Sequence, residues 1–135
     1  MIGIVIVAHG QLAREYLAAI EHVVGDQTGI RAIGIEANHD RAAKQSEICS
    51  AADEVDTGQG VVLVTDLFGG SPSNLSLPAC QPQGRRILYG ANLPMLIKLA
   101  TFREAKPLDE LAAFIKAYGQ RNISVASELI PESDA

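Results

Sequence analysis

The chain has 135 residues, of which 47% are hydrophobic and only 4% aromatic, and its net charge is −5 at pH 7. This length and composition predict one domain with a core of aliphatic side chains. The acidic balance argues against nucleic acid and anionic membrane surfaces as partners, because no basic excess is available to neutralise phosphates.

Apolar, β-branched runs alternate along the chain with segments whose apolar residues recur at spacings of three and four. The first pattern is typical of buried strands and the second of helices. Glycine, proline and polar clusters separate the segments, as expected of turns. In chain order we predict a strand at 2–8, a helix at 11–24, a strand at 30–35, a helix at 40–55, a strand at 61–65, a helix at 71–79, a strand at 86–89, helices at about 94–102 and 107–119, and a strand at 123–127.

These elements imply βαβ units with right-handed crossovers. We therefore expect an α/β fold with an open, doubly wound, parallel four-stranded sheet and helices on both faces. With the strand order 2-1-3-4, the first and third strands are neighbours. In such sheets ligands bind at the carboxyl ends of the strands. Those ends carry His9 and Gly10, residues 36–40, Asp66 and Asn92.

The glycine-rich segment at residues 66–74 follows the third predicted strand. Gly69 and Gly70 permit a tight turn and a close backbone approach to a ligand. Ser71 suits a helix N-cap and Pro72 the first helical position. A helix start has free N–H groups that can bind an anion. The segment therefore predicts a phosphate-binding turn, although a loop that only caps a helix would have the same pattern.

His9 and Asp66 would face each other across the crevice between the first and third strands. A carboxylate on one ring nitrogen fixes the histidine tautomer and leaves the other nitrogen free as a nucleophile. An incoming phosphoryl group would then meet the N–H groups of the glycine turn. The alternative is that His9 is a loop histidine without a role. We expect His22 to be a partly exposed helix residue, and His39 to be a solvated loop residue that could also rim the site.

Several other chemistries lack their sequence signatures. The chain has no G-x-x-x-x-G-K-[ST] loop, no G-x-G-x-x-G after the first strand and no G-x-S-x-G elbow. Its three histidines and two cysteines lack the spacing of metal ligands. We therefore expect no cofactor and no metal, and we expect Cys49 and Cys80 to be reduced thiols.

Nothing in the sequence predicts a membrane segment. No apolar run approaches the roughly 18 residues that a span requires. Residues 1–4 lack the basic start of a signal peptide and lead directly into a predicted strand. We therefore expect a cytoplasmic protein without direct membrane insertion.

Three segments together resemble the enzyme IIA domain of the mannose family, from the bacterial phosphoenolpyruvate-dependent sugar phosphotransferase system. They are Ala-His-Gly at 8–10, Asp-Leu-Phe-Gly-Gly-Ser-Pro-Ser-Asn at 66–74 and Gly-Ala-Asn-Leu-Pro-Met-Leu at 90–96. They stand in the same order at the ends of strands one, three and four, and the resemblance extends over nearly the whole chain, to about Leu129. The dihydroxyacetone-kinase phosphotransfer subunit is similar at the first segment but differs after the third strand.

The resemblance implies a phosphotransferase in which His9 takes a phosphoryl group on Nε2 from the phosphocarrier HPr and passes it to a IIB protein. Asp66 would be the acidic residue beside that histidine. Gly69, Gly70 and Ser71 would form the turn that faces the phosphate. The residues implied at the rim of the site are Gly10, Phe68 and Asn92, with Phe68 standing where some sugar-transporting members have tryptophan.

The family resemblance also implies a homodimer in which a fifth, C-terminal strand is exchanged between subunits. Residues 123–127 alternate as such an antiparallel edge strand would. We place the IIA domain at residues 1–129 and a short disordered tail at 130–135. Because no Pro- and Ala-rich linker to a IIB domain follows, we expect a free-standing IIA protein.

Three functions remain open from the sequence. A free-standing IIA could carry phosphoryl groups for sugar uptake. It could instead be a regulator whose His9 phosphorylation state controls partner binding. A small-anion-binding domain without covalent chemistry would need the turn at residues 69–71 but not His9.

Overall fold

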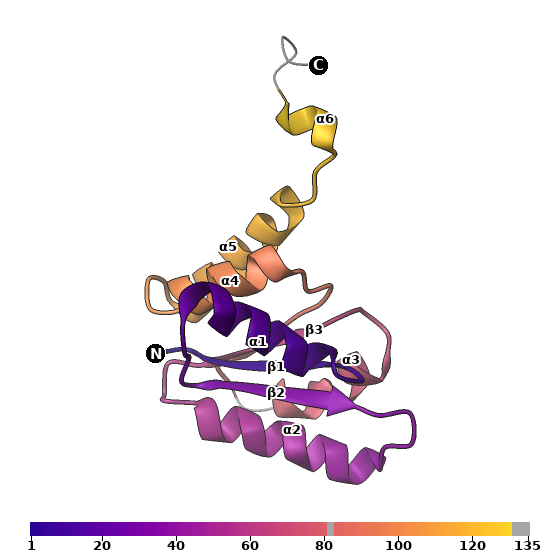
Figure 1. Ribbon diagram of the computed structural model, residues 1–135. Coiled ribbons are helices and arrows are strands. Elements are labelled where there is room, and N and C mark those ends of the chain that lie inside the picture. The colour runs from indigo at the N-terminus through magenta and orange to yellow at the C-terminus, as the bar shows by residue number, and fades with distance from the viewer. Residues whose placement is uncertain (81–82, 131–135) are drawn as a thin grey trace.

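Four parallel strands form the centre of the computed structural model, which describes residues 1–80 and 83–130 (Figure 1). The sheet has the order β2-β1-β3-β4, with every neighbouring pair parallel. The strands are β1 (Gly3–His9), β2 (Ile30–Ile35), β3 (Val61–Thr65) and β4 (Arg85–Leu88). The helices are α1 (Leu12–Val24), α2 (Arg41–Val55), α3 (Ser71–Ser76), α4 (Leu93–Phe102), α5 (Leu108–Arg121) and α6 (Ala126–Leu129), with a short 3₁₀ helix, η1 (Leu77–Cys80), after α3.

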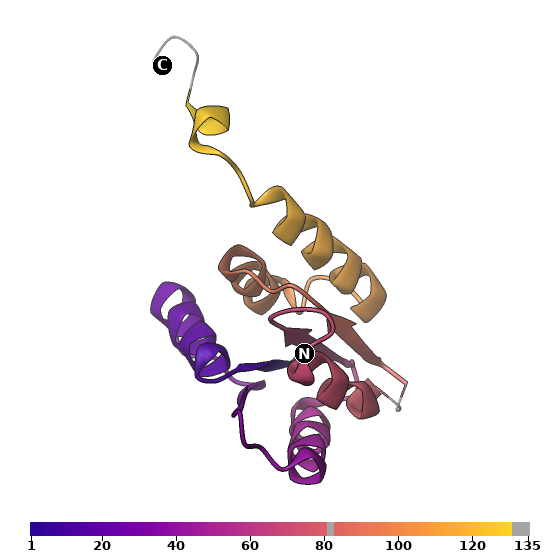
Figure 2. The ribbon, with the colours of Figure 1, turned by 90° about the vertical axis from the view of Figure 1, so that its right-hand side faces the viewer.

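Both faces of the sheet are covered by helices, because the central strands are apolar on both sides. Successive side chains of a strand point to opposite faces. Ile4 and Ile6 of β1 pack in one cluster with residues of α1, α4 and α5. Val5 and Val7 pack in a second cluster with residues of α2, α3 and η1. Figures 1 and 2 show these two layers on opposite sides of the sheet.

The predicted four-stranded parallel sheet and its order are confirmed. The bounds of β2 and β3 agree with the prediction, and β4 begins one residue earlier than expected. The helix predicted at 71–79 is divided into α3 and η1. Pro78 has no N–H to donate to the carbonyl one turn back, which accounts for this break. No helix in the described ranges is long and apolar enough to cross a membrane.

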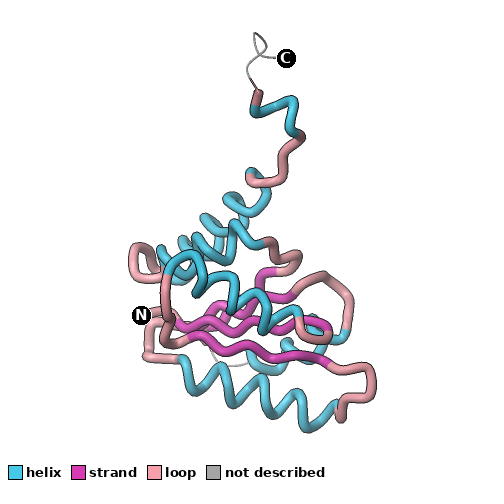
Figure 3. The backbone as a smooth tube through the Cα atoms, in the orientation of Figure 1, coloured by secondary structure: helices cyan, strands magenta, loops and turns pink. Residues whose placement is uncertain are grey.

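The fifth strand predicted at residues 123–127, which was expected to pair with a partner subunit, is not formed within the single chain. Residues 123–125, all described, form no helix or strand, and α6 follows them. The segment projects away from the sheet and its helices (Figure 3). A strand needs a neighbour to pair its N–H and C=O groups, whereas here the Glu128 carboxylate accepts the Val125 N–H at 3.0 Å and begins a helical turn. Ile123 and Val125 remain 76% and 63% exposed. Of the predicted tail, residues 131–135 lie outside the described residues.

One buried cation ties β4 to α2 at the amino ends of the strands. The Arg85 side chain is 4% exposed. It donates to Asp53 at 2.9 Å, to Asp56 at 3.2 Å and to the Ala79 carbonyl at 3.0 Å. The N–H of Gly58 lowers the pKa of the Asp56 carboxyl, and Arg85 lowers it further against the opposing effect of burial. Asp56 is therefore ionised at neutral pH and balances the charge of Arg85.

We predict that Asp56→Asn lowers the free energy of unfolding at neutral pH by about 1 kcal/mol, because the partly buried pair loses its charge interaction. The folded protein binds a proton at Asp56 more weakly than the unfolded chain does. This stabilisation is thus present above the ordinary pKa of 3.8 and is lost as pH falls through the lower pKa of the folded state. Urea unfolding over a pH series should show the two proteins converging in acid.

The control variant for this test is Asp53→Asn, since the Asp53 carboxylate is largely exposed and should contribute less. A loss of stability in Asp56→Asn that is equal at neutral and acidic pH would mean that packing, and not charge, is responsible.

Candidate active site

His9 and Asp66 meet at the carboxyl end of the sheet. His9 is the last residue of β1 and Asp66 follows β3, and the register of these neighbouring strands pairs Val7 with Thr65. Asp66 Oδ2 accepts the backbone N–H of His9 at 3.0 Å and lies 2.8 Å from His9 Nδ1. The His9 side chain is 51% exposed and the Asp66 side chain only 9%. The strand order thus brings the two residues together as the sequence predicts.

The contact with Asp66 fixes the tautomer of His9. An ionised carboxylate can only accept a hydrogen bond, so Nδ1 must carry the proton. In the neutral ring Nε2 then has a free lone pair. Among the described residues, Nε2 has no hydrogen-bond partner. The exposed nitrogen is therefore available as a nucleophile.

Asp66 is held in its charged form by hydrogen bonds. Burial alone would raise the pKa of this carboxyl. The backbone and ring N–H groups of His9, and the Leu67 N–H that donates to Oδ1 at 3.0 Å, more than reverse that effect, so the pKa lies below its ordinary value. Asp66 is consequently a permanent acceptor for the His9 ring at neutral pH.

The glycine turn lies directly against the reactive edge of His9. A Cβ atom on Gly70 would stand 3.1 Å from His9 Cε1 and 3.5 Å from Nε2, so a side chain at this position would crowd the His9 ring. Gly69 has a φ of 89°, a left-handed conformation that glycine adopts without strain. Gly70, and not Ser71, is the N-cap of α3. The Ser71 side chain makes no capping hydrogen bond and instead lines the space beside His9.

A hollow of about 350 Å³ adjoins His9, and we call it the His9 hollow. It is lined by His9, Gly10, Ile35, Glu36, Ala37, His39 and Ser71. Its far wall comes from the loop between β2 and α2. Gly34 permits this arrangement, since a Cβ there would lie 2.3 Å from the Gly10 carbonyl oxygen. The Gly10 N–H in turn donates to the Ile35 carbonyl at 2.9 Å.

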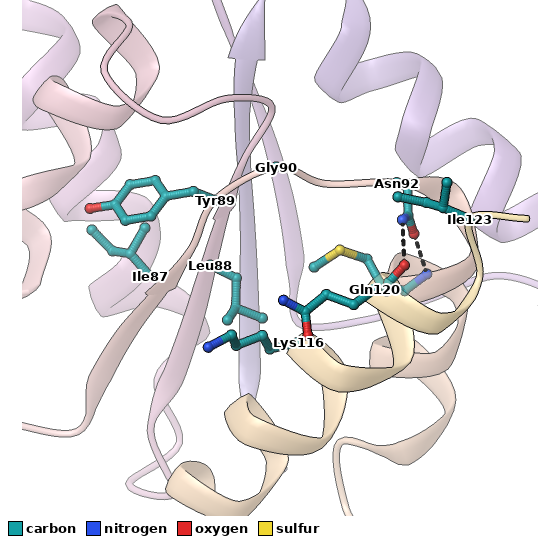
Figure 4. A pocket seen from close by; sticks show the side chains of 10 residues that line it. Ile87, Leu88, Tyr89, Gly90, Asn92, Lys116, Gln120 and Ile123 are labelled. Carbon is teal, nitrogen blue, oxygen red and sulfur yellow. Dashed lines mark hydrogen bonds between the residues drawn. The ribbon is translucent and has the colours of Figure 1, made fainter.

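Two of the implied rim residues differ in their surroundings. Phe68 is 77% exposed and packs edge-on against Tyr89, with 5.1 Å between the ring centroids. Asn92 caps α4 by accepting the Met95 N–H at 3.0 Å, and its amide donates to the Gly119 carbonyl at 3.0 Å (Figure 4). Asn92 lines a separate groove beside β4 and is not among the residues of the His9 hollow.

Two supporting residues were not singled out from the sequence. Thr65 is fully buried and its hydroxyl donates to the Leu67 carbonyl at 3.3 Å, which braces the turn after Asp66. The Tyr16 hydroxyl donates to the Ala91 carbonyl at 3.3 Å. Burial and then the charge of Asp66 raise the pKa of Tyr16. The only sequence signal for Thr65 is a hydroxyl residue at the end of an otherwise apolar strand.

The model of the EIIA-man family, described as the PTS system fructose IIA component, matches residues 3–116. The mannose-specific EIIAB component of Escherichia coli (strain K12) is 28% identical over 124 residues, which make up 90% of this chain but 38% of that protein. The fructose-specific EIIA component of Bacillus subtilis (strain 168) is 25% identical over 129 residues, 95% of this chain and 88% of that protein. The chain therefore spans well under half the length of the E. coli relative.

A solved structure shares the whole fold. The mannose/sorbose-specific IIA subunit of the phosphotransferase system from Enterococcus faecalis superposes with a TM-score of 0.85 at 26% identity, covering 97% of each chain. The family match and these relatives confirm the resemblance drawn from residues 8–10, 66–74 and 90–96. The chain belongs to the EIIA-man family of phosphotransferase-system IIA components.

Proposed function

We propose that this protein is a cytoplasmic phosphocarrier that is phosphorylated on His9 by phospho-HPr and passes the phosphoryl group to a IIB protein. The observation that carries the proposal is the His9–Asp66 pair, in which Nδ1 is bound at 2.8 Å and Nε2 faces the Gly70 backbone. Membership of the EIIA-man family supports phosphotransferase chemistry.

The transfer is a displacement at phosphorus. As the bond between phosphorus and the donor atom of HPr breaks, a bond forms from phosphorus to Nε2 of His9. The proton on Nδ1 stays between the ring and Asp66, whose charge balances the positive ring. N–H groups of the turn at Gly69 and Gly70 and the Ser71 hydroxyl bind the phosphoryl oxygens. Transfer to the IIB protein repeats these bond changes with Nε2 as the leaving atom.

The first prediction concerns phosphoryl acceptance. Intact-mass analysis after incubation with phosphoenolpyruvate, enzyme I and HPr should show one acid-labile phosphoryl group on the wild-type protein and none on His9→Ala. His22→Ala, a change at an exposed helix histidine, should be labelled like wild type. Labelling with ATP alone should fail, since the sequence has no nucleotide-binding loop.

Undiminished labelling of His9→Ala would falsify the assignment of His9. A labelled protein that no IIB protein can discharge would favour the regulatory function over the carrier. No labelling of wild type, with another IIA protein labelled in the same tube, would leave only an anion-binding role.

Asp66→Asn should reduce the rate of phosphoryl acceptance by roughly 10²–10⁴-fold, the range expected when an orienting partner is lost. An asparagine can offer its N–H₂ to Nδ1, which favours the tautomer with the proton on Nε2 and removes the nucleophile. Rapid-quench kinetics with phospho-HPr would measure the rate, with Asp109→Asn on α5 as the control. A rate within about threefold of wild type would contradict the role of Asp66.

We further propose that the protein is a homodimer in which residues 123–130 of one copy pack against the other. Ile123, Val125 and Leu129 are exposed apolar residues on this projecting segment. β4 is an edge strand, and beside it lies a groove of about 360 Å³ formed with α5 (Figure 4). Packing of the segment along this edge would bury its apolar side chains and would cover the open edge of β4 and the groove beside it.

Val125→Asp should therefore convert a dimer into a monomer, because an unpaired charge in an apolar contact is costly. Light scattering coupled to gel filtration would give the mass of each protein, and Ser124→Asp is the matched control at the neighbouring exposed position. A wild-type protein that is monomeric at micromolar concentration would refute the dimer.

A further inference from the structure

The His9 hollow has a second histidine, His39, on the loop between β2 and α2. The Glu36 carbonyl accepts the His39 backbone N–H at 3.2 Å and lies 2.7 Å from ring Nδ1. Because a carbonyl can only accept, Nδ1 must carry a proton. The ring is thus held by one nitrogen, and Nε2 has no hydrogen-bond partner among the described residues. The edge that carries Nε2 therefore remains free to bind a ligand.

The charges around the hollow are unfavourable to a phosphoryl group. Such a group brings nearly two negative charges at neutral pH. Glu36 lines the hollow and Asp66 lies behind the His9 ring. None of the residues that line the hollow is lysine or arginine. Apart from the ring of His9 itself, His39 is the only lining side chain that can become a cation.

The nearby charged residues do not take over this role. Asp40 uses Oδ1 to accept the Ala43 N–H at 3.0 Å and cap α2. Lys44 pairs with Glu47 at 3.0 Å on the same helix. Arg41 begins α2 and is exposed. None of these side chains lines the hollow.

We propose that His39 is a second phosphoryl-binding residue, which takes up a proton on Nε2 and binds the phosphoryl group when His9 carries it. This inference rests on the proposed phosphorylation of His9. A neutral His39 has a lone pair on Nε2, which would repel a phosphoryl oxygen that approaches it. A proton from water converts Nε2 into a charge-assisted donor. The same proton returns to water when the phosphoryl group leaves.

The coupling works in both directions. A phosphoryl group on His9 favours the protonated ring of His39, and the protonated ring stabilises phosphorylated His9 by the same factor. His39 therefore shifts the equilibrium of phosphoryl transfer between HPr and this protein toward the phosphorylated form. A purely structural histidine that pins the loop to Glu36 would have no such effect.

Ring nitrogen-15 spectra of histidine-labelled protein, recorded at about pH 7.5, test the proton uptake directly. Phosphorylation by phosphoenolpyruvate, enzyme I and HPr should increase the protonated fraction of the His39 ring and leave His22 unchanged. An unchanged His39 spectrum in protein whose His9 is phosphorylated would overturn the inference alone. Absence of phosphorylation at His9 would overturn the proposed function as well.

The equilibrium constant for transfer from phospho-HPr provides a second readout, measured by intact mass at fixed ratios of HPr to phospho-HPr. His39→Gln and His39→Ala should each lower it about tenfold, the effect of losing one charge-assisted hydrogen bond. His39→Lys should restore it to within about threefold of wild type, since a cation is returned to the hollow. His22→Ala should have no effect. An equilibrium constant for His39→Gln equal to that of wild type would assign His39 a structural role only.

Discussion

The contact between Asp66 and Nδ1 of His9 is the interaction on which the site depends, and the strand order is its precondition. The two residues are 57 positions apart in the chain. They meet because β1 and β3 are neighbours in a parallel sheet, with β2 on the other side of β1. A single carboxylate oxygen then bonds both the backbone and the ring of His9. The helices on both faces bury this sheet, and the packed sheet holds the geometry.

The parts of the fold that were predictable are those in which local pattern and tertiary packing agree. β3 is a fully buried run and β2 is apolar except for the partly exposed Arg31, so the bounds of both could be predicted directly. The pairing of His9 with Asp66 followed from the strand order alone. By contrast, the alternation at residues 123–127 indicated a strand, but no strand of the same chain lies beside it. The alternation of apolar and polar residues indicates which side chains are more stable when buried. Whether a neighbouring strand is present to pair with the segment depends on the rest of the structure.

The close approaches within the site could not be read from the sequence. Gly34 lies near the carboxyl end of β2 and is not part of a turn, yet its missing Cβ admits the Gly10 carbonyl. Gly70 was identified as part of a turn, but not as the residue whose backbone lies against the His9 ring. His39 was expected to be a solvated loop residue that could also rim the site, and only the folded loop decides between these by placing it in the His9 hollow. Each of these facts depends on contacts between segments that are distant in the chain.

The unequal exposure of His9 and Asp66 suits the exchange of a phosphoryl group with other proteins that we propose. Half of the His9 side chain is exposed, while Asp66 is largely buried and its lowered pKa keeps it charged at neutral pH. A carrier must bind the phosphoryl group without trapping it, so permanent cations beside Nε2 would be a disadvantage. Neutral N–H donors of the turn, together with the proposed gain of charge by His39 when the phosphoryl group is bound, would meet both demands. When the group departs, the proposed release of the His39 proton to water would leave no cation among the residues that line the hollow.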